Sequence, residues 1–348
     1  MKYHSPEAIQ DSIVQYVAAR NQYRGQTHPI AAVKPHPLER QYLDILSLLK
    51  TPEAFALDTS RTGTKSRRLP LGATLTITFA GPSAYQQPDD RHTDPTLLPV
   101  FTHRRIWWRG ALAEALWMWR GDTSLQRLDS LLPGASALWD NWAILDDNQA
   151  ATSGPHVGRA YGYQFGQFLA PAIDKIKSSP DTRRAGFSLM QERDRPLMAL
   201  ECCHGCWIQF RSLPLGDNKQ RLLYLDMDQR SADWLLGATL NILAYYLLLR
   251  VVSTYLNMEM GGIKYTFNDV HLYEDHIDQA NEIYPRCTHR PPRLHFQPFP
   301  MLPREEGLAM WRAMDTRAAI NALQMDWFTL DSALNYISLP NMKANVAV

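Results

Sequence analysis

Apolar residues recur at helical spacing in three parts of the chain. In the stretches Gln41–Leu49 and Trp108–Trp119 they fall three and four positions apart, which predicts amphipathic helices. The stretch Ser231–Tyr255 is apolar on nearly every side, which predicts a buried helix. Three strand-like runs are Ala73–Phe79, Cys206–Arg211 and Leu222–Asp226. Because helices and strands interleave without a steady β-α-β rhythm, we predict an α+β fold.

The long apolar helix carries polar residues that bear on its ends and its environment. Ser231 is the expected N-cap, and Asp233 lies in the first turn, where a carboxylate stabilises the helix dipole. The uninterrupted apolar part, Trp234–Leu249, is shorter than the roughly 20 residues of a membrane span and includes Asn241. We therefore expect a helix of the protein core and no membrane association.

Two segments rich in proline and polar residues predict surface loops. These are Tyr85–Pro99 and Pro285–Pro303. No repeat and no glycine- or serine-rich linker divides the 348 residues. We therefore expect a single domain over residues 1–348, with loop insertions near 82–98 and 285–303.

Composition narrows the class of protein. The net charge of +1 argues against a protein that binds a nucleic-acid backbone. With 45% hydrophobic residues the chain can bury a sizeable core. No stretch near the N-terminus has the order of a signal peptide, and three of the four cysteines crowd together instead of forming a disulfide framework. These features predict a reduced, cytoplasmic protein.

The cysteine cluster Glu201–Cys206 admits three interpretations. Its thiols and His204 suggest a metal site, but structural zinc sites draw ligand pairs from distant segments, and only Cys287 and His289 are available here. One thiol is alternatively a nucleophile, which requires a nearby positive charge to form a thiolate. Small buried cysteines that only pack a strand are the third interpretation.

Arginines beside hydroxyl groups occur at three distant places. The segment Arg61–Thr64 places a guanidinium beside a glycine turn and two hydroxyls. Gln229–Ser231 precedes the predicted helix, where backbone amides favour an anion, and Arg183 and Arg184 follow a Pro-Asp turn. Each alone is more often a solvated surface arginine, but together they are able to form a phosphate site.

A polar stripe marks one face of the apolar helix. Asp233, Gly237 and Asn241 are spaced four apart and so share a face. A carboxylate, a gap and a carboxamide suit the recognition of a polar ligand. Helix packing at Gly237, with the Asn241 amide bonded to backbone, explains the stripe equally well.

Taken together, these motifs resemble the thymidylate synthase superfamily, which includes thymidylate synthases and pyrimidine-nucleotide hydroxymethylases. The resemblance extends from about Tyr42 to about Gln279, with a short echo in Ala344–Val348. Its motifs are Arg61–Thr64, Glu114–Trp117, Gly121–Thr123, Trp139–Ala143, Tyr161–Gln164, Arg183-Arg184, Cys203-His204, Gln229–Asp233, Leu236-Gly237, Asn241-Ile242, and His271–Tyr273 with His276.

The resemblance implies a fold and an assembly. The expected fold has a central mixed sheet covered by helices, and the chain would form a homodimer through a sheet face. Arg61 and Arg230 would bind the phosphate of dUMP, together with Gln229 and Ser231. In this family Arg183 and Arg184 would reach the phosphate site of the partner subunit.

The resemblance also implies the chemistry. The Cys203 thiolate would add to C6 of the pyrimidine, so that C5 attacks the methylene carbon of 5,10-methylenetetrahydrofolate, with no metal. Glu114 and Tyr161 would organise the proton transfers, and His204 and Asp233 also match catalytic positions. Asn241 would read the base, where an amide suits uracil and an aspartate would suit cytosine. The remaining site residues match the sugar-binding pair, His271 and Tyr273, and the folate pocket, Trp107, Trp139, Trp142, Asp233, Gly237 and the terminal Val348.

Departures from the family pattern gather around the cysteine and the folate. A histidine expected near folate is Trp107, and the proline expected before the nucleophile is Cys202. A Pro-Phe pair is Thr239-Leu240, a Gly-Gly pair is Phe267-Asn268, and a Trp-Asn-Pro run is replaced around Met190–Glu192. Trp139 and the C-terminal tail favour a thymidylate synthase. The number of departures favours a dUMP hydroxymethylase, such as those of viruses that modify their DNA, and this is the product that the sequence favours slightly.

Overall fold

The structure is a computed structural model that describes residues 36–51, 54–58, 64–79, 93–99, 102–145, 154–216, 220–284 and 291–331. Its helices are α2 (Pro37–Lys50), α3 (Trp108–Trp119), α4 (Leu125–Leu131), η2 (Ala135–Trp142), α5 (Gly162–Ser178), η3 (Glu192–Leu197), α6 (Gly237–Tyr255), η4 (Glu274–His276), α7 (Ile277–Ile283), α8 (Arg304–Arg312), α9 (Thr316–Ala322) and η5 (Met325–Trp327). Its strands are β1 (Phe55–Asp58), β2 (Lys65–Leu69), β3 (Ala73–Thr78), β4 (Gly186–Phe187), β5 (His204–Pro214), β6 (Arg221–Asp233), β7 (Glu259–Tyr273), β8 (Leu294–Phe296) and β9 (Phe328–Leu330). Arg61, Val348 and the terminal segment 344–348 lie outside the described residues, as do parts of both expected loop insertions.

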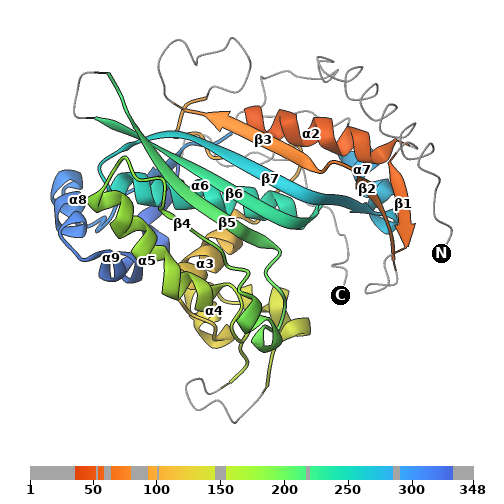
Figure 1. The fold of residues 1–348 in the computed structure, drawn as a ribbon, viewed down its shortest axis with the longest axis horizontal. Helices are drawn as coiled ribbons and strands as arrows, with labels where there is room; N and C mark the ends of the chain where they lie inside the picture. The colour runs from red at the N-terminus through yellow and green to blue at the C-terminus, as the bar shows by residue number, and fades with distance from the viewer. Residues whose placement is uncertain are drawn as a thin grey trace.

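A large mixed sheet is the centre of the fold (Figure 1). Its strands follow the order β1-β2-β7-β6-β5-β4, and β3 pairs with β7 as well. The long strands β6 and β7 are parallel and are joined through α6, whereas the other pairs are antiparallel. The fold is therefore α+β with a central mixed sheet, as the sequence predicted.

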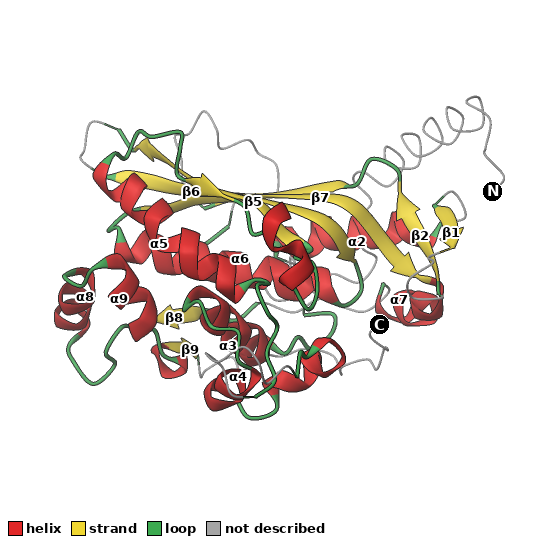
Figure 2. Cartoon of the chain, turned by 60° about the horizontal axis from the view of Figure 1, so that its bottom comes forward, coloured by secondary structure: helices red, strands yellow, loops and turns green. Residues whose placement is uncertain are grey.

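The two faces of the sheet have different surroundings. Figure 2 shows α5 and α6 packed below the sheet, whereas no described helix covers the opposite face over β5 and β6. Along β5 the residues Ile208 and Phe210 are fully buried, while the alternate positions Trp207 and Leu213 are 42% and 49% exposed. This uncovered side of β5 and β6 is called the open face below.

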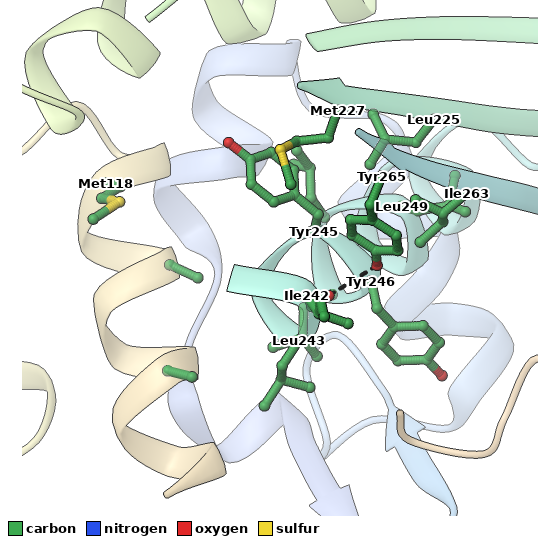
Figure 3. Packing of buried hydrophobic residues seen from close by; sticks show 14 of the residues in the cluster. Met118, Leu225, Met227, Ile242, Leu243, Tyr245, Tyr246, Leu249, Ile263 and Tyr265 are labelled. Carbon is green, nitrogen blue, oxygen red and sulfur yellow. Dashed lines mark hydrogen bonds between the residues drawn. The ribbon is translucent and has the colours of Figure 1, made fainter. Parts of the chain in front are cut away.

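Helix α6 forms the core under the sheet. Figure 3 shows its apolar side chains facing β6 and β7 on one side and α3 on the other. Tyr265 of β7 donates its hydroxyl hydrogen to the carbonyl of Ile242 at 2.8 Å, which gives a buried phenol its partner. α6 has the length and hydropathy of a membrane span, yet 67% of it is buried inside the fold. It is a core helix, as its pattern predicted.

The sequence predicted several elements closely and misplaced others. α3 has the predicted bounds, α2, β5 and β6 contain the predicted stretches, and β3 ends one residue before the predicted Phe79. The segment 285–303 was expected to be a loop, but it contains β8, which pairs with β9. Leu294 and Phe296 are buried there, since Phe296 stacks on Phe328 with ring centroids 4.6 Å apart. A two-residue apolar alternation between prolines was too short to reveal a strand.

Candidate active site

A bulge at the start of β5 sets the position of Cys203. The register with β6 shifts between His204 and Trp207. Gly205, inside the bulge, has φ of +69°, and an added Cβ would lie 2.6 Å from the Tyr245 hydroxyl oxygen. Only glycine combines this backbone conformation with such a close approach. The chain therefore turns sharply two residues after Cys203.

The Tyr161 hydroxyl makes two contacts with Cys203. It donates to the sulfur at 3.2 Å and accepts from the Cys203 backbone N–H at 2.8 Å. Tyr161 precedes α5 with φ of +22°, an uncommon value for a residue with a side chain. Strained backbone of this kind is concentrated at functional sites. The phenol and the thiol are thus held against each other by the backbone of two elements.

The three clustered cysteines have different environments. Cys202 is fully buried, accepts a hydrogen bond from the Tyr161 N–H at 3.3 Å, and has its pKa raised by burial to about 12. The Cys206 thiol donates to the Cys203 carbonyl at 3.8 Å. Burial also raises the pKa of the Cys203 thiol, but the Tyr161 hydrogen bond and the charge of Arg230 act in the opposite direction. Of the three, only Cys203 has a phenol hydrogen bond directed at its sulfur.

Arg230 lies beside the cysteine segment with its side chain 41% exposed. Its backbone N–H donates to the Cys203 carbonyl at 2.9 Å, and its Nε donates to the Cys202 carbonyl at 3.1 Å. The guanidinium is thus fixed by backbone while part of it stays accessible to an anion. The structure thus places Arg230 beside Cys203, and the phosphate role of this arginine stays a prediction.

Glu114 on α3 is held by a tryptophan. The Trp139 indole N–H donates to Glu114 Oε1 at 2.7 Å, and the Trp139 ring packs edge-on against Tyr161. Burial raises the pKa of Glu114 to about 7, although the indole hydrogen bond acts to lower it. A carboxyl group that titrates near neutral pH is suited to both giving and accepting a proton.

His204 is a buried, neutral imidazole. Its ring stacks on Tyr161 with centroids 4.5 Å apart, and its Nδ1 lies 2.9 Å from the Tyr245 hydroxyl oxygen. Burial lowers the pKa of His204 to about 3. Burial therefore favours the neutral ring, which contacts Tyr161 and shares a hydrogen bond with Tyr245.

Asn241 is oriented by a chain of amides. Its Nδ2 donates to Gln229 Oε1 at 3.1 Å, and Gln229 Nε2 donates to the Ser231 carbonyl at 2.7 Å. These bonds fix which end of the Asn241 amide is oxygen. Asn241, Glu114 and His204 line one cavity, together with the apolar residues Ala115, Met118, Trp119, Phe165, Leu240, Ala244 and Tyr245. The structure therefore brings together three site residues that the sequence had placed far apart.

The helix start differs from the predicted one. Ser231 lies in β6 opposite Asp269, and α6 begins only at Gly237. Asp233 ends β6 and therefore does not lie in the first turn of α6; its Oδ1 accepts from the N–H groups of Leu235 and Leu236 at 3.1 and 3.2 Å in the turn that leads to the helix, whose N-cap Leu236 has no side-chain cap. The Ser231 N-cap was wrong because the polar alternation of Gln229, Ser231 and Asp233 has the period of a strand.

The other predicted site residues are the expected sugar-binding pair, the expected folate-binding residues and the arginine pair. His271 and Tyr273 are buried at the end of β7, with ring centroids 5.0 Å apart. Trp142 packs edge-on against Trp139, Trp107 is 44% exposed before α3, and an added Cβ on Gly237 would meet no atom within 4 Å. Arg183 and Arg184 are exposed just before β4, and no hydrogen bond or ion pair joins either guanidinium to the cysteine segment among the described residues.

Two residues near the site gave no signal in the sequence. Arg104 is buried and donates to Thr239 Oγ1 at 3.0 Å and to the Leu235 carbonyl, so it ties the chain before α3 to the start of α6. Tyr245 bonds to His204 across the core. The Thr239 that replaces an expected proline thereby acquires a hydrogen-bond role.

No group of three or more metal-binding side chains occurs among the described residues. In the comparison with known proteins, the family model for thymidylate synthase matches residues 41–348. The chain belongs to the thymidylate synthase family. A thymidylate synthase of Rhizobium rhizogenes is 30% identical to this chain over 300 residues, which is 77% of this chain and 88% of the relative.

Membership of the thymidylate synthase family fixes the reaction class. The chain is a folate-dependent one-carbon transferase acting at C5 of a pyrimidine nucleotide. Methylenetetrahydrofolate is the co-substrate, which confirms that prediction.

Proposed function

We propose that the chain methylates dUMP at C5 to give thymidylate, through a covalent bond between Cys203 and C6 of the uracil ring. The observation that carries this proposal is the pair of contacts between the Tyr161 hydroxyl and Cys203, 3.2 and 2.8 Å long. Its support also includes the cavity lined by Glu114, His204 and Asn241, where several polar groups converge.

Bond formation begins at the sulfur. The Cys203 thiolate adds to C6, and the electron pair of the C5–C6 double bond moves to C5, which bonds to the methylene carbon of the co-substrate as one of that carbon's two C–N bonds breaks. Because burial raises the pKa of Cys203, the thiolate depends on the charge of Arg230 and on the Tyr161 hydrogen bond. Loss of the C5 proton, assisted by Tyr161, and departure of tetrahydrofolate leave an exocyclic methylene group on C5.

Asn241 reads the base in this proposal. Its Nδ2 gives one hydrogen to Gln229, so one N–H remains to donate to O4 and the carbonyl oxygen remains to accept from N3–H. Cytosine presents an acceptor at N3 and a donor at its amino group, the reverse pattern. The amide chain through Gln229 and Ser231 thus favours uracil and disfavours cytosine.

The phosphate and sugar contacts complete the nucleotide site. Arg230 and Arg61 bind the phosphate with help from Ser231, while His271 and Tyr273 bind the 3′-hydroxyl. Because the phosphate and sugar are bound, C6 is held close to Cys203. This raises the effective concentration of C6 at the thiolate.

Arg183 and Arg184 act on the partner subunit's site in a homodimer. Both are exposed beside β4, and Gln209 of the open face donates to the Arg183 carbonyl at 2.9 Å. Exposed Trp207 and Leu213 on that face support association with a second copy. A reduced, cytoplasmic enzyme remains the expectation for its location.

The last step decides the product. Hydride from the folate adds to the exocyclic methylene and gives thymidylate, whereas water adds there and gives 5-hydroxymethyl-dUMP; in both cases the Cys203–C6 bond breaks, which restores the C5–C6 double bond and releases the thiolate. Trp139 is 6% exposed, and its indole N–H donates to Glu114 Oε1. A buried indole that bonds this carboxyl in place of a water molecule favours hydride transfer, which is why thymidylate is the proposed product.

Hydroxymethylation is the second candidate, and one observation favours it. Trp107, where the family has a histidine, is 44% exposed, and its ring lies over Gly110 at the start of α3. A changed folate wall at this point would let water compete for the methylene group. This remains the product that the sequence alone slightly favoured.

Product mass distinguishes the two reactions. Purified protein is incubated with dUMP and methylenetetrahydrofolate, and both nucleotide and folate are analysed by mass spectrometry. Thymidylate with an equal amount of dihydrofolate is the expected result. A nucleotide heavier than thymidylate by one oxygen, with tetrahydrofolate regenerated, would establish the hydroxymethylase.

A further inference from the structure

Strand β2 carries an arginine into the sugar-binding end of the site. In the antiparallel register, Arg68 stands directly opposite His271, and Ser66 stands opposite Tyr273. Directly opposed residues of neighbouring strands project from the same face of a sheet. Arg68 therefore lies on the same side as the pair that is expected to bind the 3′-hydroxyl.

The Arg68 guanidinium is bound on two sides. Its Nη1 lies 2.9 Å from Asp269 Oδ2, and its Nε donates to Ser66 Oγ at 3.2 Å. The Arg68 and Asp269 side chains are 32% and 35% exposed, so water screens this ion pair less than a pair on the open surface. One donor of the guanidinium thus reaches the carboxylate, and the bond from Nε to the Ser66 hydroxyl fixes the orientation of the guanidinium.

The second oxygen of the same carboxylate faces His271. Asp269 Oδ1 lies 3.6 Å from His271 Nδ1, which is also 3.3 Å from the Asp269 backbone oxygen. This Oδ1 is buried and accepts no hydrogen bond within the described part of the chain. With two acceptors beside Nδ1, the favoured imidazole tautomer carries its hydrogen there and leaves Nε2 as an acceptor.

Asp269 stays ionised in this setting. The His271 imidazole lowers the pKa of the carboxyl most, Arg68 and Arg230 lower it further, and burial opposes them. A carboxylate that remains charged keeps its attraction for both neighbours.

We propose that Arg68 is a positioning residue for sugar recognition: it holds Asp269 so that His271 presents Nε2 to the 3′-hydroxyl of the nucleotide. The inference rests on the proposed function, in which the substrate is a deoxyuridine monophosphate. It adds a selection rule, because only a free 3′-hydroxyl has a hydrogen to donate to Nε2. A nucleotide whose 3′ oxygen is esterified, as inside a polynucleotide, lacks that hydrogen.

The neighbouring Arg67 provides a matched control. It stands opposite Leu272 instead of His271, and its Nη1 donates to the Lys50 carbonyl at the end of α2, 2.8 Å away. Arg67 therefore shares the strand, charge and length of Arg68 but has no contact with the Asp269 pair.

Steady-state kinetics with two nucleotides tests the proposal. dUMP and its 3′-deoxy analogue, 2′,3′-dideoxyuridine monophosphate, are each given to the wild type and to the variants Arg68→Gln, Arg68→Lys and Arg67→Gln. In Arg68→Gln we expect KM for dUMP to rise about tenfold with kcat nearly unchanged, as for the loss of one charge-assisted contact. The KM for the analogue should not change, because the contact is already missing. Arg68→Lys should recover part of the dUMP affinity, and Arg67→Gln should behave as the wild type.

Two results would overturn the role of Arg68. One is an equal rise in KM for both nucleotides in Arg68→Gln, which would mean a general effect on the site or on folding. The other is an unchanged KM for dUMP. A wild-type protein that turns over no dUMP would instead contradict the proposed function, and the sugar role of Arg68 with it. Thermal unfolding of each variant, with Arg68→Lys as the milder change, separates a folding defect from a binding defect.

Discussion

The carboxyl group of Glu114 lies where burial and a single indole hydrogen bond determine its protonation. Its pKa of about 7 stands above the ordinary value of 4.5. Below pH 4.5 the carboxyl is neutral in both folded and unfolded chains. Between pH 4.5 and 7 the unfolded chain ionises first, so Glu114 lowers the stability of the fold progressively as the pH rises.

Replacing Glu114 by Gln should therefore stabilise the protein in a pH-dependent way. At pH 8 the free energy of unfolding of Glu114→Gln should exceed that of the wild type by about 2 kcal/mol, and near pH 4.5 the two should agree. Turnover should be lost at both pH values, because a carboxamide neither takes nor gives the proton. Chemical denaturation at the two pH values measures this.

Glu192 offers the control for this prediction, since its side chain is 78% exposed. Glu192→Gln should leave both the stability difference and the turnover close to wild type. A gain in stability that is equal at pH 4.5 and pH 8 would contradict the raised pKa of Glu114.

At the scale of single elements, the bulge at the start of β5 makes the position of Cys203 depend on the backbone conformation of Gly205. Gly205→Ala should lose about 2 to 4 kcal/mol of stability, since it adds left-handed backbone strain to a clash with the Tyr245 hydroxyl. It should also lower turnover, because Cys203 and His204 directly precede the glycine. Urea unfolding and steady-state kinetics provide the two measurements.

Gly216 is the control that separates the effect of backbone strain at Gly205 from the effect of the close contact with Tyr245. Its φ of +62° resembles that of Gly205, but an added Cβ would meet nothing within 4 Å. Gly216→Ala should lose only about 1 kcal/mol and keep full turnover. If both alanine variants behaved alike, the close packing around the bulge would not matter to the site.

Local pattern predicted the elements whose signal is local. The helical spacing of Trp108–Trp119 was enough to predict α3, because apolar residues three and four positions apart mark the buried face of a helix. The start of α6 was misplaced, because the strand alternation through Asp233 runs directly into an apolar helix. β8 was missed, because its partner β9 lies more than thirty residues later in the chain.

The same distinction applies to the site. Cys203, Arg230 and Asn241 lie in short motifs that the sequence displays directly. Arg68 and Asp269 are 201 residues apart, and Arg104 and Thr239 are 135 apart. Such contacts depend on strand register and side-chain direction, which no periodicity specifies.

At the scale of the whole molecule, the open face and the position of Arg183 and Arg184 predict sites shared between subunits. Neither Cys203→Ser nor the double variant Arg183→Gln, Arg184→Gln should be active alone. After subunit exchange in an equal mixture, half of the dimers carry one intact site, so about a quarter of wild-type activity should return.

Native mass spectrometry confirms that mixed dimers have formed in this complementation experiment. Arg127→Gln, which alters another largely exposed arginine, should stay active without mixing. Mixed dimers without any regained activity would contradict the shared site, and a monomer at assay concentration would contradict the interface.

The central claim is that Cys203 bonds to C6 of a uracil nucleotide while the carbon arrives at C5. A 5-fluoro-dUMP substrate has no C5 proton to lose, so the reaction should stop with protein, nucleotide and folate joined. Intact-protein mass spectrometry after incubation with 5-fluoro-dUMP and methylenetetrahydrofolate should show the summed mass of all three, mapped by digestion to the peptide containing Cys203 and absent in Cys203→Ser. An unmodified wild-type protein, or an adduct that persists in Cys203→Ser, would contradict the account.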